Sequence, residues 1–130
     1  MAELSLRLEE ASKAVATLAE IVEMEFSIII RDATIQRFEY SFEATWKALR
    51  EHLKEREGIL CNSPKSCFRE ALRLGLLTEE ETARCLEMTD RRNDTTHTYR
   101  EEIAQAIYRE IPSFLGLLQI LIAGMEERAD

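Results

Sequence analysis

Glycine and proline are scarce in this sequence of 130 residues, which contains only 4 Gly and 2 Pro. An all-β domain needs a turn about every 8–12 residues, and these two residue types supply much of the turn chemistry. The scarcity therefore excludes an all-β domain. The contents of 45% hydrophobic and 32% charged residues are ordinary for a globular protein and wrong for a disordered one. We predict a single all-α domain over residues 1–130.

Positive charge is also in short supply. The chain has 25 Asp and Glu residues against 17 Lys and Arg, which gives a formal net charge of −8. A broad, non-specific nucleic-acid surface needs clustered Lys and Arg, so the composition argues against one. A small, local RNA-cleaving site is still compatible with this charge.

Cysteine and histidine, the commonest zinc ligands, are few as well. The three cysteines, Cys61, Cys67 and Cys85, contain no C-x-x-C pair, and no histidine falls at ligand spacing. We therefore expect no metal site and no cofactor. An odd number of cysteines without such a pair is typical of reduced thiols in a cytoplasmic protein.

An apolar run of about 20 residues, which a bilayer span requires, is missing too. The most apolar stretch, Ile111–Met125, is shorter, and we interpret it as a buried core helix. Charged residues at Glu3, Arg7 and Glu9 exclude a signal peptide. The sequence thus predicts a cytoplasmic protein without a membrane partner.

Apolar residues recur at helical spacing in the first half of the chain. They predict one helix near the N-terminus and a second that opens at Arg31-Asp32 and ends at Gly58. We interpret Trp46 as a core residue rather than a platform for stacking bases. The predicted core residues are Leu4, Leu8, Ala11, Val15, Leu18 and Val22 in the first helix, and Ile35, Phe38, Phe42, Thr45, Trp46, Leu49 and Leu53 in the second.

Capping signals divide the second half of the chain. Ser63-Pro64, an N-cap followed by proline at the first helical position, predicts a short helix over residues 64–74. Thr78-x-x-Glu81 and Thr98-x-x-Glu101 have the form of capping boxes that start a fourth and a fifth helix. Pro112 kinks or restarts the last helix, which continues to about residue 125. The pattern predicts an antiparallel bundle of four to five helices.

The junction at residues 93–97 brings several reactive groups together. Arg92 and His97 can converge there, whereas five residues on one continuous helix would splay them by about 140°. Arginine can hold phosphate oxygens, and histidine can move the proton of a ribose 2′-hydroxyl or of a leaving 5′-oxygen. Asn93 would orient either group. The segment could therefore bind and cleave a phosphodiester without a metal.

The spacing of Arg92 and His97 is weak evidence by itself. With 13 Arg and 2 His in the chain, chance alone supplies about half a match. The alternative is that Arg92 caps the end of a helix and that His97 is a solvated loop residue.

A resemblance to a known family adds to this pattern. The run Arg92-Asn93-x-x-x-His97-x-Tyr99 resembles the R-x4-H-x-Y signature of HEPN domains that are paired with minimal nucleotidyltransferases. The segment from Arg31 to Lys47 is similar to the long helix of that family, whose members are often named nucleotidyltransferase substrate-binding proteins. Ser63-Pro64-Lys65 also fits. Together these segments cover roughly residues 28–112.

The resemblance implies a HEPN bundle that forms a homodimer, with Arg92 and His97 of both chains lining one cleft. Many HEPN proteins are metal-independent endoribonucleases and act as toxins. Their nucleotidyltransferase partner acts as the antitoxin, in some pairs by adding AMP to the motif tyrosine, which is Tyr99 here. The resemblance thus implies catalytic roles for Arg92, Asn93 and His97 and a modification site at Tyr99. We leave open whether Tyr99 is exposed or packs its ring.

The second helix also carries a polar stripe, at spacings of four, three, four and four residues, which lies on one face. The stripe would line the cleft or position Arg92. The alternative is a solvated face with a Glu43–Lys47 ion pair worth a few tenths of a kcal/mol. The stripe consists of Asp32, Gln36, Glu39, Glu43 and Lys47.

Three functions fit these observations. The first is a dimeric HEPN ribonuclease that a nucleotidyltransferase controls, and the Arg–Asn–His–Tyr set favours it. The second is a non-catalytic subunit that presents a nucleotide or another substrate to the nucleotidyltransferase, and the acidic net charge favours it. A purely structural helical dimer is the third.

Overall fold

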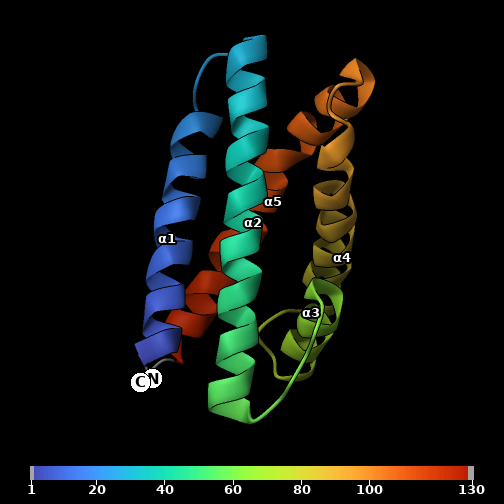
Figure 1. Cartoon of the computed structure of the whole chain (residues 1–130). Coiled ribbons are helices and arrows are strands. Elements are labelled where there is room, and N and C mark those ends of the chain that lie inside the picture. The colour runs from blue at the N-terminus through green and yellow to red at the C-terminus, as the bar shows by residue number, and fades with distance from the viewer. Residues whose placement is uncertain (1, 129–130) are drawn as a thin grey trace.

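The computed structural model describes residues 2–128, which form helices and no strands. The chain runs up α1, down α2, up α4 and down α5, with the short α3 at the lower end between α2 and α4 (Figure 1). The predicted all-α antiparallel bundle is thus confirmed. The helices are α1 (Ala2–Val22), α2 (Ile28–Glu57), α3 (Pro64–Arg73), α4 (Glu79–Asp94) and α5 (Glu101–Glu127), with a 3-10 helix, η1 (Thr95–His97), between α4 and α5.

The core lies where α1, α2 and α5 pack against one another, with α3 and α4 closing it on one side. Every predicted core residue of α2 is buried, Trp46 included. The predicted seam of α1 is buried as well, except that Ile21 takes the buried place expected for Val22. Phe38 stacks on Phe114 of α5 with ring centroids 5.5 Å apart. Apolar burial at helical spacing therefore holds the three long helices together.

Helix α2 begins earlier than the sequence indicates. The Ser27 side chain accepts a hydrogen bond from the Ile30 backbone N–H at 3.0 Å and caps the helix. The predicted start at Arg31-Asp32 is therefore wrong by one turn. The predicted end is confirmed, because Gly58 adopts φ +67° and closes the helix in the left-handed conformation.

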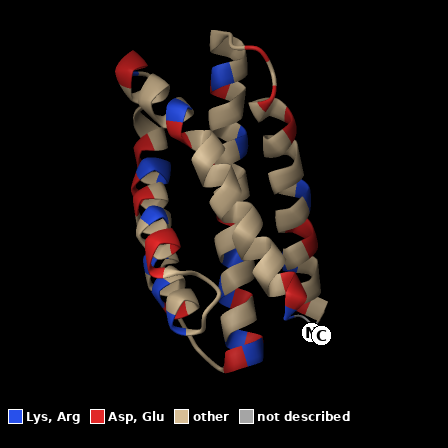
Figure 2. Ribbon diagram, turned by 180° about the vertical axis from the view of Figure 1, so that it is seen from behind, with Lys and Arg blue, Asp and Glu red and all other residues tan. Residues whose placement is uncertain are grey.

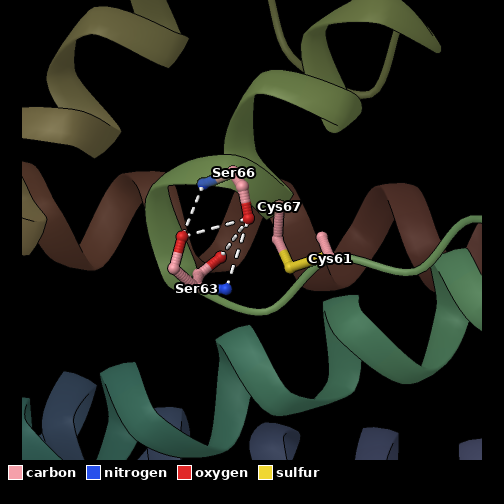
Figure 3. The surroundings of a disulfide bond; sticks show 4 residues. All are labelled: Cys61, Ser63, Ser66 and Cys67. Carbon is pink, nitrogen blue, oxygen red and sulfur yellow. Dashed lines mark hydrogen bonds between the residues drawn. A yellow bond between two sulfur atoms is a disulfide. The ribbon is translucent and has the colours of Figure 1, made fainter.

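The start of α3 is fixed by a capping box and a disulfide (Figure 3). The Ser63 and Ser66 hydroxyls each accept a hydrogen bond from the other residue's backbone N–H, both at 3.2 Å. The cap turns the loop back, so that Cys61 meets Cys67 with 5.5 Å between Cα atoms, a separation typical of a disulfide. The expectation of reduced thiols is therefore wrong for this pair. Cys85 is free and buried.

The predicted helix break is present, but one of the two predicted capping boxes is not. Thr78 and Glu81 form the expected box at the start of α4. Helix α5 instead begins after Arg100, which makes no side-chain capping bond. The Thr98 hydroxyl donates to the Thr95 carbonyl at 3.2 Å, which stabilises the 3-10 turn rather than capping α5. The break itself falls after Asp94, within the predicted range.

Helix α5 continues through Pro112 without a restart. Its length and apolar composition would also suit a bilayer span, so the argument from the shorter Ile111–Met125 stretch does not decide that question. One face of α5 packs against α1, α2 and α4, and Figure 2 shows it from behind as a largely uncharged helix between more highly charged neighbours. Its buried residues are Ala104, Ile107, Ile111, Phe114, Leu117, Leu118, Leu121, Ile122 and Met125.

Candidate functional site

Arg92, in the last turn of α4, is held against α2. Its guanidinium carbon lies 4.8 Å from the centroid of the Phe42 ring, within range for a cation–π contact. Its Nη1 is 3.5 Å from Oε1 of Glu43. The buried Nε has no hydrogen-bond partner among residues 2–128. The aromatic face and the carboxylate thus hold the guanidinium against α2.

His97 closes the 3-10 helix and is exposed, as is Asn93 one turn earlier. The Tyr99 hydroxyl is 3.5 Å from Nδ1 of His97, and the two rings meet edge to face. The Tyr99 side chain is 80% exposed, which answers the question that the sequence left open. A phenol and an imidazole are thus presented side by side to solvent.

The upper part of the polar stripe borders this phenol. Asp32, Ile35 and Glu39 of α2 line a depression of about 300 Å³ together with Thr98 and Tyr99. Two of the predicted stripe residues therefore face the motif.

The remaining residues of the stripe differ in whether they have partners. Glu43 pairs with Arg92 and accepts a hydrogen bond from the Trp46 indole N–H, so the predicted Glu43–Lys47 pair is wrong for this structure. Gln36 is exposed and Lys47 is half-buried, and neither forms a hydrogen bond or ion pair within the described part of the chain. The stripe positions Arg92 through Glu43 alone.

No hydrogen bond or ring contact joins Arg92 to His97 within residues 2–128, although the helix break lies where we expect it. Instead both parts of the motif border the same face of α2. Arg92 meets Glu43, and Tyr99 shares the depression with Glu39. These two α2 residues are four apart, which is a rise of about 6 Å along the helix. Convergence therefore takes place onto α2 rather than directly between the two side chains.

A buried arginine that the sequence analysis did not single out anchors the junction. The Arg31 side chain is only 3% exposed and donates hydrogen bonds to Glu101, Asp32 and Gln105. The hydrogen bond from Arg31 lowers the pKa of the Glu101 carboxyl below its ordinary value. The contact fastens the first turn of α5 to the first turn of α2. Its signal in the sequence is spacing, since Arg31 lies four residues before Ile35 on the apolar stripe.

The site thus combines a planar cation, an imidazole and a phenol at one end of the bundle. Such groups suit an anionic substrate whose reaction transfers protons. Within residues 2–128, no group of three or more His, Cys, Asp or Glu side chains is placed to hold a metal ion.

Comparison with known proteins finds a matching family and a curated relative. Residues 6–127 match a family described as nucleotidyltransferase substrate binding protein like. A Haemophilus influenzae protein named probable ribonuclease HepT is 33% identical over 98 residues, which cover 72% of this chain and 66% of that protein. The match therefore spans slightly less than two thirds of that relative's length.

Two solved structures are similar to the whole bundle. A crystal structure of a Thermus thermophilus protein is 46% identical, with a TM-score of 0.85, and the match covers 88% of this chain and 98% of that one. A Haemophilus influenzae structure is 27% identical, with a TM-score of 0.69, over 95% of this chain and 96% of that one. Its description states that it reveals the fold of a substrate-binding domain of a nucleotidyltransferase.

Proposed function

The chain belongs to the nucleotidyltransferase substrate-binding protein-like family, and on that premise we propose that it is the HEPN subunit of a pair with a minimal nucleotidyltransferase. In this proposal two copies form a homodimer that cleaves RNA without a metal. The nucleotidyltransferase controls that activity, as in a toxin–antitoxin module.

The observation that carries the proposal is that Arg92 is held against the face of α2 that also borders Tyr99, with His97 exposed next to that phenol. A guanidinium held against Phe42 and Glu43 is suited to binding the non-bridging oxygens of a phosphodiester. His97 would take the proton of the ribose 2′-hydroxyl. The 2′-oxygen would then attack phosphorus, and the bond to the 5′-oxygen would break. The products would be a 2′,3′-cyclic phosphate and a 5′-hydroxyl.

One chain supplies a single imidazole, but the cleavage needs a base for the 2′-hydroxyl and an acid for the leaving 5′-oxygen. A second copy related by a two-fold axis would supply the other histidine and a second arginine. This need supports a homodimer in which the surroundings of His97 face the partner.

Control by the nucleotidyltransferase would act at Tyr99. Its exposed hydroxyl is accessible to a modifying enzyme and lies 3.5 Å from Nδ1 of His97. An AMP group attached there would place a bulky anion beside the imidazole. The anion would block the cleft and repel the RNA phosphate.

The test is RNA cleavage by alanine variants. We expect His97→Ala and Arg92→Ala each to lower the cleavage rate by about 10²–10⁴-fold while the helical circular dichroism spectrum is retained. Arg69→Ala, at an exposed arginine of α3, serves as the control and should retain full activity. Cleavage should survive EDTA, because side chains supply the proton transfer and the charge stabilisation.

The second candidate is a non-catalytic subunit that presents a nucleotide to the nucleotidyltransferase. The net charge of −8 and the pairing of Arg92 with Glu43 favour it, because both weaken the attraction for RNA. Calorimetry with ATP separates the two candidates. A dimer that cuts no RNA, and whose Arg92→Ala variant loses only nucleotide or partner binding, would establish the second function in place of the first.

A further inference from the structure

The connection between α1 and α2 presents apolar side chains to solvent. All residues from Glu23 to Ile29 are exposed, and four of them are large and apolar. Ile29 is the most exposed of these, at 81%. We call the four residues the connection patch; they are Met24, Phe26, Ile28 and Ile29.

Contacts with the rest of the bundle hold the connection patch in place. The Phe26 ring packs edge-on against Tyr108 of α5, with 5.6 Å between centroids. Ser27 caps α2, so Ile28 and Ile29 belong to its first helical turn. Exposed apolar side chains on a fixed backbone are typical of a docking surface, because little conformational freedom is lost on binding.

Acidic residues lie next to those of the patch in the sequence. Glu23 and Glu25 alternate with its apolar residues, and Asp32 follows one turn later, whereas the nearby Arg31 is buried and paired with Glu101. Figure 2 shows the acidic residues of this connection beside the uncharged end of α2. RNA and anionic lipid would be repelled, and a second copy would set the same carboxylates against its own. The complementary partner is a protein whose apolar side chains are bordered by Lys and Arg.

The patch lies at the end of the bundle that carries the motif. The Arg31–Glu101 contact joins the first turns of α2 and α5, and Asp32 lines the depression that contains Tyr99. We propose that the connection patch is the surface on which the nucleotidyltransferase docks, so that its active site reaches Tyr99. This inference rests on the proposed function and adds to it the place of contact and the chemistry of the partner's surface.

The test compares two exposed apolar residues at opposite ends of α2. Ile29→Lys removes an apolar contact and places a positive charge opposite the Lys and Arg residues expected on the partner. We therefore expect it to weaken binding to the purified nucleotidyltransferase about tenfold or more. Leu60→Lys makes the same change at a residue that is 79% exposed beyond the far end of α2. It should leave the dissociation constant within about twofold. The affinity of the unaltered chain should fall as salt is added, because the acidic rim attracts the partner.

The possible results of the Ile29→Lys experiment lead to different conclusions. Sedimentation and circular dichroism first establish that Ile29→Lys keeps its fold. Nucleotidyltransferase binding that Ile29→Lys leaves unchanged overturns this inference alone. Dissociation of a homodimer by Ile29→Lys, with partner binding retained, assigns the patch to a second copy and overturns it as well. An unaltered chain that does not bind the nucleotidyltransferase overturns both this inference and the proposed pairing.

Discussion

Glu43 of α2 and Arg92 of α4 face each other, with 3.5 Å between Oε1 and Nη1. The carboxylate is itself held by a hydrogen bond from the Trp46 indole N–H, so it is a fixed partner rather than a mobile one. An ion pair at such partial exposure contributes only about 0–1 kcal/mol to the free energy of unfolding. Its effect is therefore on the orientation of the guanidinium rather than on the stability of the bundle.

The first prediction concerns this positioning. Glu43→Gln retains the shape of the side chain and an acceptor for Trp46, but it no longer attracts the guanidinium. We expect kcat for RNA cleavage to fall about tenfold, since misplacement of a catalytic group is costly, while the melting temperature stays the same. Glu57→Gln, at the exposed far end of α2, is the matched control. An unchanged kcat in Glu43→Gln would show that Arg92 needs no such support.

The second prediction is a homodimer with the surroundings of His97 in its interface. Thr96→Arg places a bulky charge on the exposed 3-10 helix and should weaken the dimer about tenfold or more in sedimentation equilibrium. Ala83→Arg, on an exposed position of α4 away from the motif, should leave the dimer unchanged. A chain that sediments as a stable monomer at micromolar concentration would contradict the two-fold site.

The third prediction separates modification from catalysis. Tyr99→Phe should not gain the mass of an AMP group when incubated with the nucleotidyltransferase and ATP, and its RNA cleavage should therefore escape silencing. Tyr40→Phe is the control, because Tyr40 is also exposed but its hydroxyl bonds to Thr17 on another face. Intact mass spectrometry reads out both variants. An AMP group on Tyr99→Phe would place the modification elsewhere.

The fourth prediction concerns pH and stability. His52 is buried, and neither of its ring nitrogens has a hydrogen-bond partner among the residues described. Burial lowers the pKa of His52 below its ordinary value of 6.5. As the pH falls below the ordinary value, His52 binds a proton in the unfolded chain but stays neutral in the folded chain. The free energy of unfolding should therefore fall, by at most about 1.4 kcal/mol per pH unit for this one group.

Urea unfolding at a series of pH values from about 7.5 to about 5.5, on either side of the ordinary histidine pKa, measures that slope. His52→Leu fills a similar volume without a titrating group, so its slope over this range should be shallower than that of the unaltered chain. Equal slopes in the two proteins would assign the pH dependence to other groups.

The fifth prediction concerns the disulfide. Cys61 and Cys67 close a loop with a sequence separation of 6, and the entropy of such a loop corresponds to about 2 kcal/mol of unfolding free energy. Dithiothreitol should lower the stability of the unaltered chain by about this amount, but not that of the variant with serine at both positions. Iodoacetamide should leave Cys85 unmodified in the folded chain, because burial raises the pKa of the Cys85 thiol to about 12.

Local patterns predicted most of the fold because helix periodicity and capping depend on neighbours in the sequence. The apolar seams, Gly58 and the Thr78 capping box are of this kind. The second capping box failed because the carboxylate of Glu101 is taken by Arg31, a partner 70 residues away that no local pattern reveals. The disulfide was missed for a related reason, since the Ser63 cap, rather than C-x-x-C spacing, brings Cys61 to Cys67.

The site was predictable to a similar extent. The motif predicts roles for Arg92, His97 and Tyr99, and helical spacing placed Glu43 on the face where it meets Arg92. Spacing on one helix could not show whether Glu43 would form its ion pair with Lys47 or with Arg92, because that depends on how α4 packs. Nor could it show that the two ends of the motif meet α2 rather than each other.

Pro112 divides the backbone hydrogen-bond ladder of α5 into two parts. It has no N–H, so the carbonyl of Tyr108 lacks its helical donor and the ladder of amide hydrogen bonds is interrupted there. Both parts are packed in the core, and the part before Pro112 also leads to Glu101 and the motif. The missing hydrogen bond therefore lies between the motif and most of the buried residues of α5. A partner that binds at the motif end would therefore bear on a helix whose hydrogen-bond ladder is already open at one point.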